Sequence, residues 1–237
     1  HLGISCKAIT KFARENRSLG LVVLGWHSLV QAKNLTFTGD EAMKLNIDLF
    51  KFMEERSIAA SKEMAKEYGE PEVLKGYGLR NTTMMSIAPT TSSAFILGQV
   101  SQGIEPVWSN CYVKDLAKLK VTVKNPFLQK LLEGKKKDDK DTWSSIRDND
   151  GSVQHLDFLD DHEKEVFRTF AELDQSLIIK QAADRQKHLD QGQSLNIMVS
   201  PDMEVREINA LYIGAWEQGI KALYYQHSMN AAQQMVR

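Results

Sequence analysis

The sequence predicts a helix-rich α/β protein, and three observations carry that prediction. An amphipathic pattern runs between residues 40 and 68, a short apolar run precedes Pro89, and residues 194–225 have the pattern of a strand, a helix and a second strand. A strand–helix–strand unit implies parallel pairing through a right-handed crossover. Apolar residues make up 42% of the 237 residues and charged residues 26%, which is typical of a globular fold.

The charge balance and the cysteines exclude several classes of protein. A net charge of −1 favours neither a nucleic-acid nor a membrane-surface binder, and no apolar run approaches the roughly 20 residues that span a bilayer. Cys6 and Cys111 show no CxxC spacing, so we expect inert thiols in a reducing, cytoplasmic compartment rather than a disulfide scaffold. The first ten residues lack the apolar region of a secretory signal.

The first part of the chain is predicted to be helical. Residues 17–31 are apolar with two glycines and predict a buried helix. Thr38 and Glu41 have the spacing of a capping box, and the helix that follows should end near Gly69, which can supply a left-handed residue. Its apolar face is predicted at Ala42, Leu45, Leu49, Phe52, Met53, Ala59, Ala60 and Met64.

The middle of the chain alternates between apolar and polar segments. Residues 84–89 predict a short buried strand that Pro89 stops, and the hydroxyl run behind it should enter a helix. Residues 133–152 are the most polar stretch and predict an exposed loop, whereas residues 162–190 are predicted to be mainly helical.

The final unit predicts a strand at 194–200, a helix beginning at Ser200 and Pro201, and a returning strand at 220–225. Gly219 should end the helix. Its buried stripe is predicted at Val205, Ile208, Leu211, Tyr212, Ala215 and Trp216.

Four hydroxylated residues form the first candidate site: Thr90, Thr91, Ser92 and Ser93. Small hydroxylated residues between a strand and a helix suit phosphate, because backbone N–H groups and hydroxyls converge there. The alternative is a plain helix cap with a polar turn, since P-loop glycines and a Walker lysine are absent. The acidic residues around His155 and His162 lack the spacing of metal ligands, so we expect no metal site.

Tyr224 and Tyr225 form the second candidate site. Neighbours in a flat strand point to opposite faces, which would make them a buried aromatic and a surface residue. Alternatively, two phenols in contact could pass on an oxidising equivalent as a radical, with the protein supplying their positions. Contact between the two rings would favour the second interpretation.

Three segments together resemble one family, the large catalytic subunit of class I ribonucleotide reductases. Residues 85–112 are similar to its Pro-Thr-x-Ser-Thr loop and Gly-Ile-Glu-Pro segment, residues 189–199 to its Gln-Ser-Leu-Asn strand, and residues 211–226 to its Leu-Tyr-Tyr-Gln strand. Residues 15–30 and 60–69 resemble earlier elements in the same order.

The resemblance implies the second half of a ten-stranded α/β barrel, extending over residues 1–237 without a separate second domain. It implies that Thr90, Thr91, Ser92 and Ser93 bind the phosphates of a ribonucleoside diphosphate. Tyr224 and Tyr225 would relay a radical from the small (beta) subunit, which carries a dimetal centre and a tyrosyl radical, to a catalytic cysteine. No cofactor is expected in this chain, and thioredoxin or glutaredoxin would be the reductant.

The sequence also departs from the family pattern. The Asn-x-Cys-x-Glu motif with the radical cysteine, the reducing cysteine pair and the C-terminal Cys-x-x-Cys are absent. We therefore expect a chain that is inactive alone and pairs with an N-terminal portion of the large subunit, either from a split gene or from a missing part. The alternatives are a non-catalytic structural or regulatory subunit derived from such an enzyme, and an unrelated α/β enzyme with a phosphate ligand.

Overall fold

The computed structural model describes residues 6–98, 100–116 and 119–228. Its α-helices are α1 (Lys7–Asn16), α2 (Trp26–Ala32), α3 (Asp40–Tyr68), α4 (Thr91–Ile96), α5 (Pro126–Gly134), α6 (Lys140–Asp148), α7 (Asp161–Val166), α8 (Gln175–Gln186) and α9 (Val205–Glu217). Two 3₁₀ turns are η1 (Glu72–Leu74) and η2 (Phe170–Glu172). The strands are β1 (Cys111–Leu116), β2 (Leu119–Lys124), β3 (Ile197–Val199) and β4 (Gln226–Ser228). No helix among these described residues is long and apolar enough to cross a membrane.

Parallel extended segments run through the centre of the molecule. Leu21 pairs with Met85 and Ile87 pairs with Gln193, both in parallel single bridges. The segment after Gln193 becomes β3, which pairs in parallel with β4. The prediction of a parallel strand–helix–strand unit is confirmed, because α9 lies between β3 and β4 in the chain.

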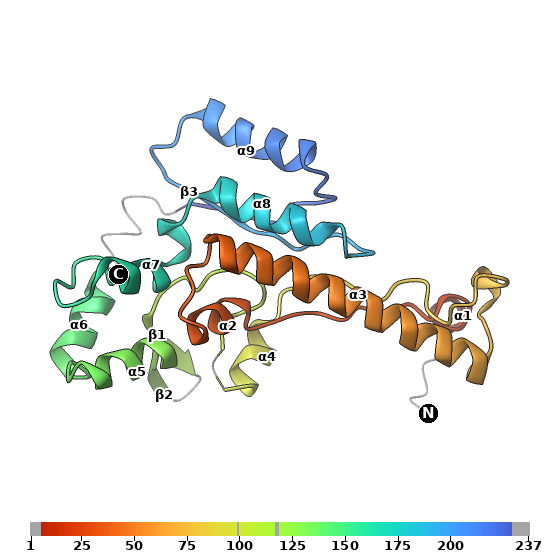
Figure 1. Ribbon diagram of the computed structural model, residues 1–237, viewed down its shortest axis with the longest axis horizontal. Helices are drawn as coiled ribbons and strands as arrows, with labels where there is room; N and C mark the ends of the chain where they lie inside the picture. Colours follow the sequence, from red (N-terminus) through yellow and green to blue (C-terminus); the bar gives the residue numbers. More distant parts are fainter. Residues whose placement is uncertain (1–5, 99, 117–118, 229–237) are drawn as a thin grey trace.

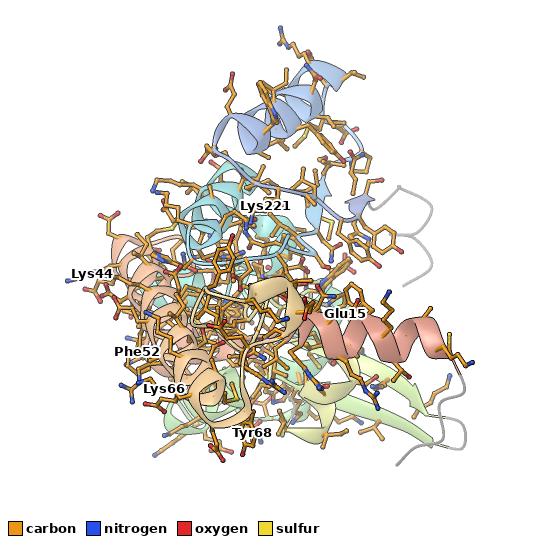
Figure 2. The ribbon with its side chains drawn as sticks, turned by 90° about the vertical axis from the view of Figure 1, so that its right-hand side faces the viewer. Glu15, Lys44, Phe52, Lys66, Tyr68 and Lys221 are labelled. Atoms are coloured by element: carbon orange, nitrogen blue, oxygen red, sulfur yellow. The ribbon has the colours of Figure 1, made fainter. Side chains whose placement is uncertain are left out.

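Helices cover this array on two sides. Figure 1 shows α9, α8 and α3 stacked one below another, with α2, α4 and the antiparallel β1–β2 hairpin beneath them. The contacts of α8 with both α3 and α9 agree with this stacking. Lys44, Phe52 and Lys66 project from α3 away from the rest of the molecule (Figure 2).

Buried side chains form two clusters. The first centres on the fully buried Trp26, whose Nε1 donates to Gln181 Oε1 at 2.9 Å, and it includes residues of α3, α8 and β3. The second joins α5 and α6 through Leu128, Leu132 and Ile146. That residues 1–237 make one domain stays a prediction.

Two buried charged or titratable groups anchor the first cluster. Arg185 is 1% exposed and donates to Gln193 Oε1 at 2.7 Å; burial lowers the pKa of this guanidinium to about 9, which the charge of Glu105 opposes. His27 on α2 accepts a hydrogen bond from the Val107 N–H at Nδ1, at 2.9 Å. Burial lowers the pKa of His27 to about 3, so the ring is neutral and free to accept that bond.

The helix predicted over 17–31 is wrong in its first half. Leu19 and Leu21 donate their N–H groups to the carbonyls of Thr83 and Met84, so this stretch is extended. Helix α2 begins only after Gly25, which holds a φ of +76°. Pairing with the 84–87 segment outweighs the local helical pattern here.

The predicted α3 is present, but its details differ. The residue before the helix is Gly39, so Thr38 lies one position too early to cap it. The end at Gly69, with a φ of +78°, is confirmed. Phe52 is 59% exposed and Ala59 and Ala60 also face outward, because the inner face of the helix moves to Ile58, Ser61 and Ala65.

The polar stretch 133–152 is not simply a loop, and the prediction there is wrong. Asp139 accepts a hydrogen bond from the N–H of Thr142 and caps α6, which buries Trp143 and Ile146 in the second cluster. The charged residues that suggested a loop are largely the exposed face and flanks of this helix. Between 162 and 190 the helical prediction holds for α7 and α8.

Short paired segments replace two of the predicted strands. The 84–89 strand is present only as the single bridges at Met85 and Ile87, although both residues are buried as predicted. The returning strand starts at Gln226 rather than within 220–225.

Helix α9 differs from its prediction in both start and burial. It begins at Val205, where Glu204 and Glu207 form a capping box, rather than at Ser200. Leu211 and Ala215 pack against the first cluster, but Val205 is 82% exposed and Trp216 75% exposed. The apolar residues predicted to be buried extend over a wider face of α9 than the face that packs against α8.

Candidate functional site

The two adjacent tyrosines are in contact. The ring centroids of Tyr224 and Tyr225 lie 4.0 Å apart, with an angle of 52° between the ring planes. Regular pairing of β4 starts only at Gln226, so the rule that neighbours diverge in a flat strand does not apply to them. Tyr224 and Tyr225 are 49% and 57% exposed as residues, so part of the pair faces outward.

Hydrogen bonds to the neighbouring strand fix the backbone of the pair. The Tyr224 N–H donates to the Leu195 carbonyl at 2.8 Å, and the Tyr225 carbonyl accepts from the Ile197 N–H at 3.0 Å. Between these two bonds, the Tyr225 N–H donates to Asn196 Oδ1 at 3.1 Å. A side chain thus takes the place of a backbone acceptor at the point where the tyrosines change direction.

Asn196 is itself held by a buried carboxylate. Glu105 accepts from the Asn196 N–H at 2.6 Å and from Nδ2 at 3.0 Å. Burial raises the pKa of Glu105, whereas these bonds and the charge of Arg185 lower it. Glu105 lies in the Gly-Ile-Glu-Pro segment, but no spacing in the sequence indicated that it reaches the tyrosine pair.

Further aromatic rings continue from the pair toward the interior. The ring of His227 lies 5.9 Å from that of Tyr225 and 4.6 Å from that of Trp108, and Trp108 lies 5.9 Å from the fully buried Phe170. Burial lowers the pKa of His227, which favours the neutral ring. Sequence reasoning could not place Trp108 and Phe170 near the pair, because both residues are far from it in the chain.

The hydroxyl run lies where the sequence predicted, at the start of the short helix α4. Thr90 precedes the helix without capping it through its side chain, and Thr91, Ser92 and Ser93 are exposed. Thr90 Oγ1 is buried and has no hydrogen-bond partner among the described residues. A Cβ at Gly103 would lie 3.4 Å from that oxygen, so the glycine allows a close approach.

The register brings the hydroxyl run and the tyrosines to the same part of the array. Ile87 pairs with Gln193, and Tyr224 bonds to Leu195 two residues further along. The chain at Pro89 and the backbone of Tyr224 are therefore separated by two strand spacings, about 10 Å.

The cysteines and the histidine- and acid-rich segment, which the sequence also singled out, lie outside the tyrosine pair and the hydroxyl run. Cys6 is exposed and Cys111 is buried, and burial raises the pKa of the Cys111 thiol. His155 bonds to Ser145 Oγ, and Asp160 caps α7. Within residues 6–98, 100–116 and 119–228, no group of three or more His, Cys, Asp or Glu could hold a metal ion.

Two hollows lie near the site without containing it. One, of about 440 Å³, runs between η2 and α9 beside Asp174 and Glu207. The other, of about 580 Å³, lies beside Trp108 and Tyr112, with Lys124 and Arg147 in its wall. Neither is lined by the hydroxyl run or by the tyrosines, which lie open in this chain.

The arrangement defines a class of protein: a helix-rich α/β protein with short parallel pairings, in which a tyrosine pair lies near a hydroxyl-rich loop. Residues 3–73 and 70–226 match the family model described as "Ribonucleotide reductase, barrel domain". The chain belongs to the ribonucleotide reductase large-subunit family and corresponds to the C-terminal part of its barrel domain.

Relatives support the same assignment. The structure is similar to the class Id ribonucleotide reductase alpha subunit of Actinobacillus ureae, with 51% identity and a TM-score of 0.88, over 99% of this chain and 44% of that one. The sequence is 40% identical to the ribonucleoside-diphosphate reductase large subunit of Invertebrate iridescent virus 6, over 93% of this chain and 23% of that protein. It is 37% identical to the putative ribonucleoside-diphosphate reductase large subunit of Frog virus 3, over 93% of this chain and 39% of that protein. The chain thus spans less than half of each of these relatives.

Proposed function

We propose that this chain is the C-terminal part of the catalytic barrel of a class I ribonucleoside-diphosphate reductase, and that it supplies substrate phosphate binding and the last steps of radical transfer. The contact between Tyr224 and Tyr225, with centroids 4.0 Å apart, carries the proposal. A pair used only for packing in a flat strand would diverge to opposite faces.

In this proposal the pair passes on a hydrogen atom. The O–H bond of Tyr224 breaks as an O–H bond forms on the oxidised Tyr225, so one proton and one electron move together and the radical ends on Tyr224. The Tyr225 side chain raises the pKa of Tyr224, which keeps on the phenol the proton that it must hand over. The protein contributes position, because the chemistry belongs to the phenols.

The hydroxyl run would bind the substrate's diphosphate. Thr91, Ser92 and Ser93 are exposed and can donate to phosphate oxygens, and the unpartnered Oγ1 of Thr90 is the one hydroxyl of the run that is buried. The openness of this region supports an assembly in which another polypeptide segment closes the site and brings the radical cysteine. We propose the N-terminal portion of the large subunit for that role.

The small subunit is the second proposed partner. Val205, Ile213 and Trp216 leave an apolar face of α9 exposed in this chain, next to the segment that leads to the tyrosines. Exposed apolar patches of this kind mark interaction surfaces. In this proposal the small subunit holds the dimetal centre and its tyrosyl radical, thioredoxin or glutaredoxin supplies the reducing equivalents, and no cofactor binds to this chain.

Replacing Tyr224 with phenylalanine tests the relay. In the reconstituted enzyme, Tyr224→Phe should abolish deoxyribonucleotide formation, because the variant ring has no O–H bond to exchange, while nucleoside diphosphate binding stays within about twofold of the wild type. Tyr68→Phe, at the exposed end of α3, is the matched control and should turn over normally. Normal turnover of Tyr224→Phe would contradict the relay.

Changing Ser92 and Ser93 to alanine tests the phosphate loop. Each lost hydrogen bond to a charged phosphate should cost about 1.5–3 kcal/mol, so diphosphate affinity should fall at least tenfold. Isothermal titration of the assembled enzyme measures this directly. Unchanged nucleotide affinity would instead favour the non-catalytic subunit.

A further inference from the structure

The amide of Tyr225 is the point at which the tyrosine pair depends on a side chain. The flanking backbone bonds, from Tyr224 to Leu195 and from Ile197 to Tyr225, join main chain to main chain. The Tyr225 N–H instead requires an acceptor at the position of Asn196 Oδ1, 3.1 Å away. The direction of the Tyr225 backbone therefore follows the orientation of the Asn196 amide.

The hydrogen bonds to Glu105 fix the orientation of the Asn196 side-chain amide. A carboxylate only accepts hydrogen bonds, so both bonds at Glu105 must be donated by Asn196, one from its N–H and one from its Nδ2. With Nδ2 turned toward Glu105, Oδ1 is left for the Tyr225 N–H. If the amide turned over, Nδ2 would face the N–H, which is also a donor, and the bond would be lost.

Glu105 is placed firmly enough to act in this way. It is 8% exposed, and it lies between Ile104, which is 3% exposed, and the Val107 N–H that His27 accepts. Burial raises the pKa of Glu105, and the two bonds from Asn196 and the positive charge of Arg185 oppose that shift and favour the carboxylate. A buried carboxylate is stable only with such bonds and charges around it.

We propose that Glu105 and Asn196 are positioning residues that set the contact between Tyr224 and Tyr225 and thereby the rate of radical transfer through the pair. The effect on rate rests on the proposed function, whereas the effect on ring contact does not. This geometry needs two pairings. The side chains at positions 105 and 196 must form a donor–acceptor pair, as Glu105 and Asn196 Nδ2 do, and the side chain at position 196 must also offer an acceptor to the Tyr225 N–H.

Exchanging the carboxylate at position 105 with the amide at position 196 tests whether both pairings are needed. Glu105→Gln can place an amide against the Asn196 amide, donor against donor, and Asn196→Asp places carboxylate against carboxylate. The double variant Glu105→Gln/Asn196→Asp restores every bond: the introduced amide donates to the introduced carboxylate, whose other oxygen still accepts from the Tyr225 N–H. Both single variants should therefore disturb the pair, and the double variant should restore it.

The readout is the titration of position 224 in the assembled enzyme. With 3-fluorotyrosine at position 224, fluorine NMR reports the ionisation of that phenol, whose pKa is raised by the Tyr225 side chain. Each single variant should move the pKa of the label toward that of the Tyr225→Phe reference, and the double variant should return it to the wild-type value. Unlabelled single variants should lose about 100-fold in turnover, the effect of a displacement near 1 Å.

A buried amide that bonds to β3 at another position provides the control. Gln175 accepts from the Met198 N–H at 2.8 Å and donates to the carbonyls of Phe170 and Leu173, so Gln175→Glu should weaken folding without moving the pKa of the label. Single variants that titrate like the wild type, or a double variant that stays disturbed, would overturn the proposal. A pKa that follows the exchange while turnover does not would uphold the positioning of the rings and refute the relay itself.

Discussion

The buried His27 makes the stability of this chain sensitive to acid. Burial lowers the pKa of His27 from 6.5 to about 3, so the neutral ring is favoured in the folded state. The stability that depends on the neutral ring is fully present above pH 6.5 and is lost as the pH falls toward 3. At about 1.4 kcal/mol for each unit, the total is about 5 kcal/mol, of which about 2 kcal/mol is lost by about pH 5.

Urea unfolding at about pH 7 and about pH 5 measures this loss. His27→Gln keeps a side chain that can accept from the Val107 N–H but does not titrate, so the variant should lose about 2 kcal/mol less than the wild type between the two conditions. His155→Gln is the control, because the His155 ring is exposed. If wild type and His27→Gln lost the same free energy of unfolding, the assignment of a neutral buried His27 would be wrong.

Two further predictions concern backbone and capping. Gly151 and Gly219 share a φ of +82°, but a Cβ at Gly151 would lie 2.7 Å from the Asn110 nitrogen, whereas nothing lies within 4 Å at Gly219. Gly219→Ala should therefore cost about 1–2 kcal/mol and Gly151→Ala about 2–5 kcal/mol in thermal unfolding; equal losses would contradict the steric argument. Asn125 caps α5 by accepting from the N–H of Phe127 at 3.0 Å, and its buried Nδ2 donates to Asn110 Oδ1 and Gln31 Oε1. Asn125→Ala should therefore cost at least about 3 kcal/mol in urea unfolding, and Asn125→Ser should recover the part due to the cap, about 1 kcal/mol.

The sequence predicted what is local in this fold. The parallel unit around α9, the extent of α3 and the hydroxyl run before α4 all follow from patterns that neighbouring residues share. The errors occurred where distant segments compete with those patterns. Residues 19–21 pair with 83–86 instead of forming a helix, and the charged flanks of α6 conceal the buried Trp143.

In the candidate site, too, the sequence predicted the local feature but not the contacts between distant segments. The sequence singled out Tyr224 and Tyr225, and the contact between their rings is present in the structure. It could not find Glu105, which reaches the pair through Asn196, because that contact depends on how two segments 91 residues apart meet in the array. The roles of the hydroxyl run and of the tyrosines stay predictions until they are tested.

Packing changes sharply along the segment that follows the hydroxyl run. Ile96 and Leu97 are 84% and 61% exposed, so little packing holds the end of α4 in place. A few residues later, the Ser101 N–H donates to Ser28 Oγ at 2.8 Å, and the Ser28 N–H donates to Ser101 Oγ at 3.2 Å. A loosely packed part opens at little cost, whereas a part pinned in this way opens only with the core. The end of α4 behind the hydroxyl run can therefore change its shape at a lower cost in free energy than the frame that carries Glu105.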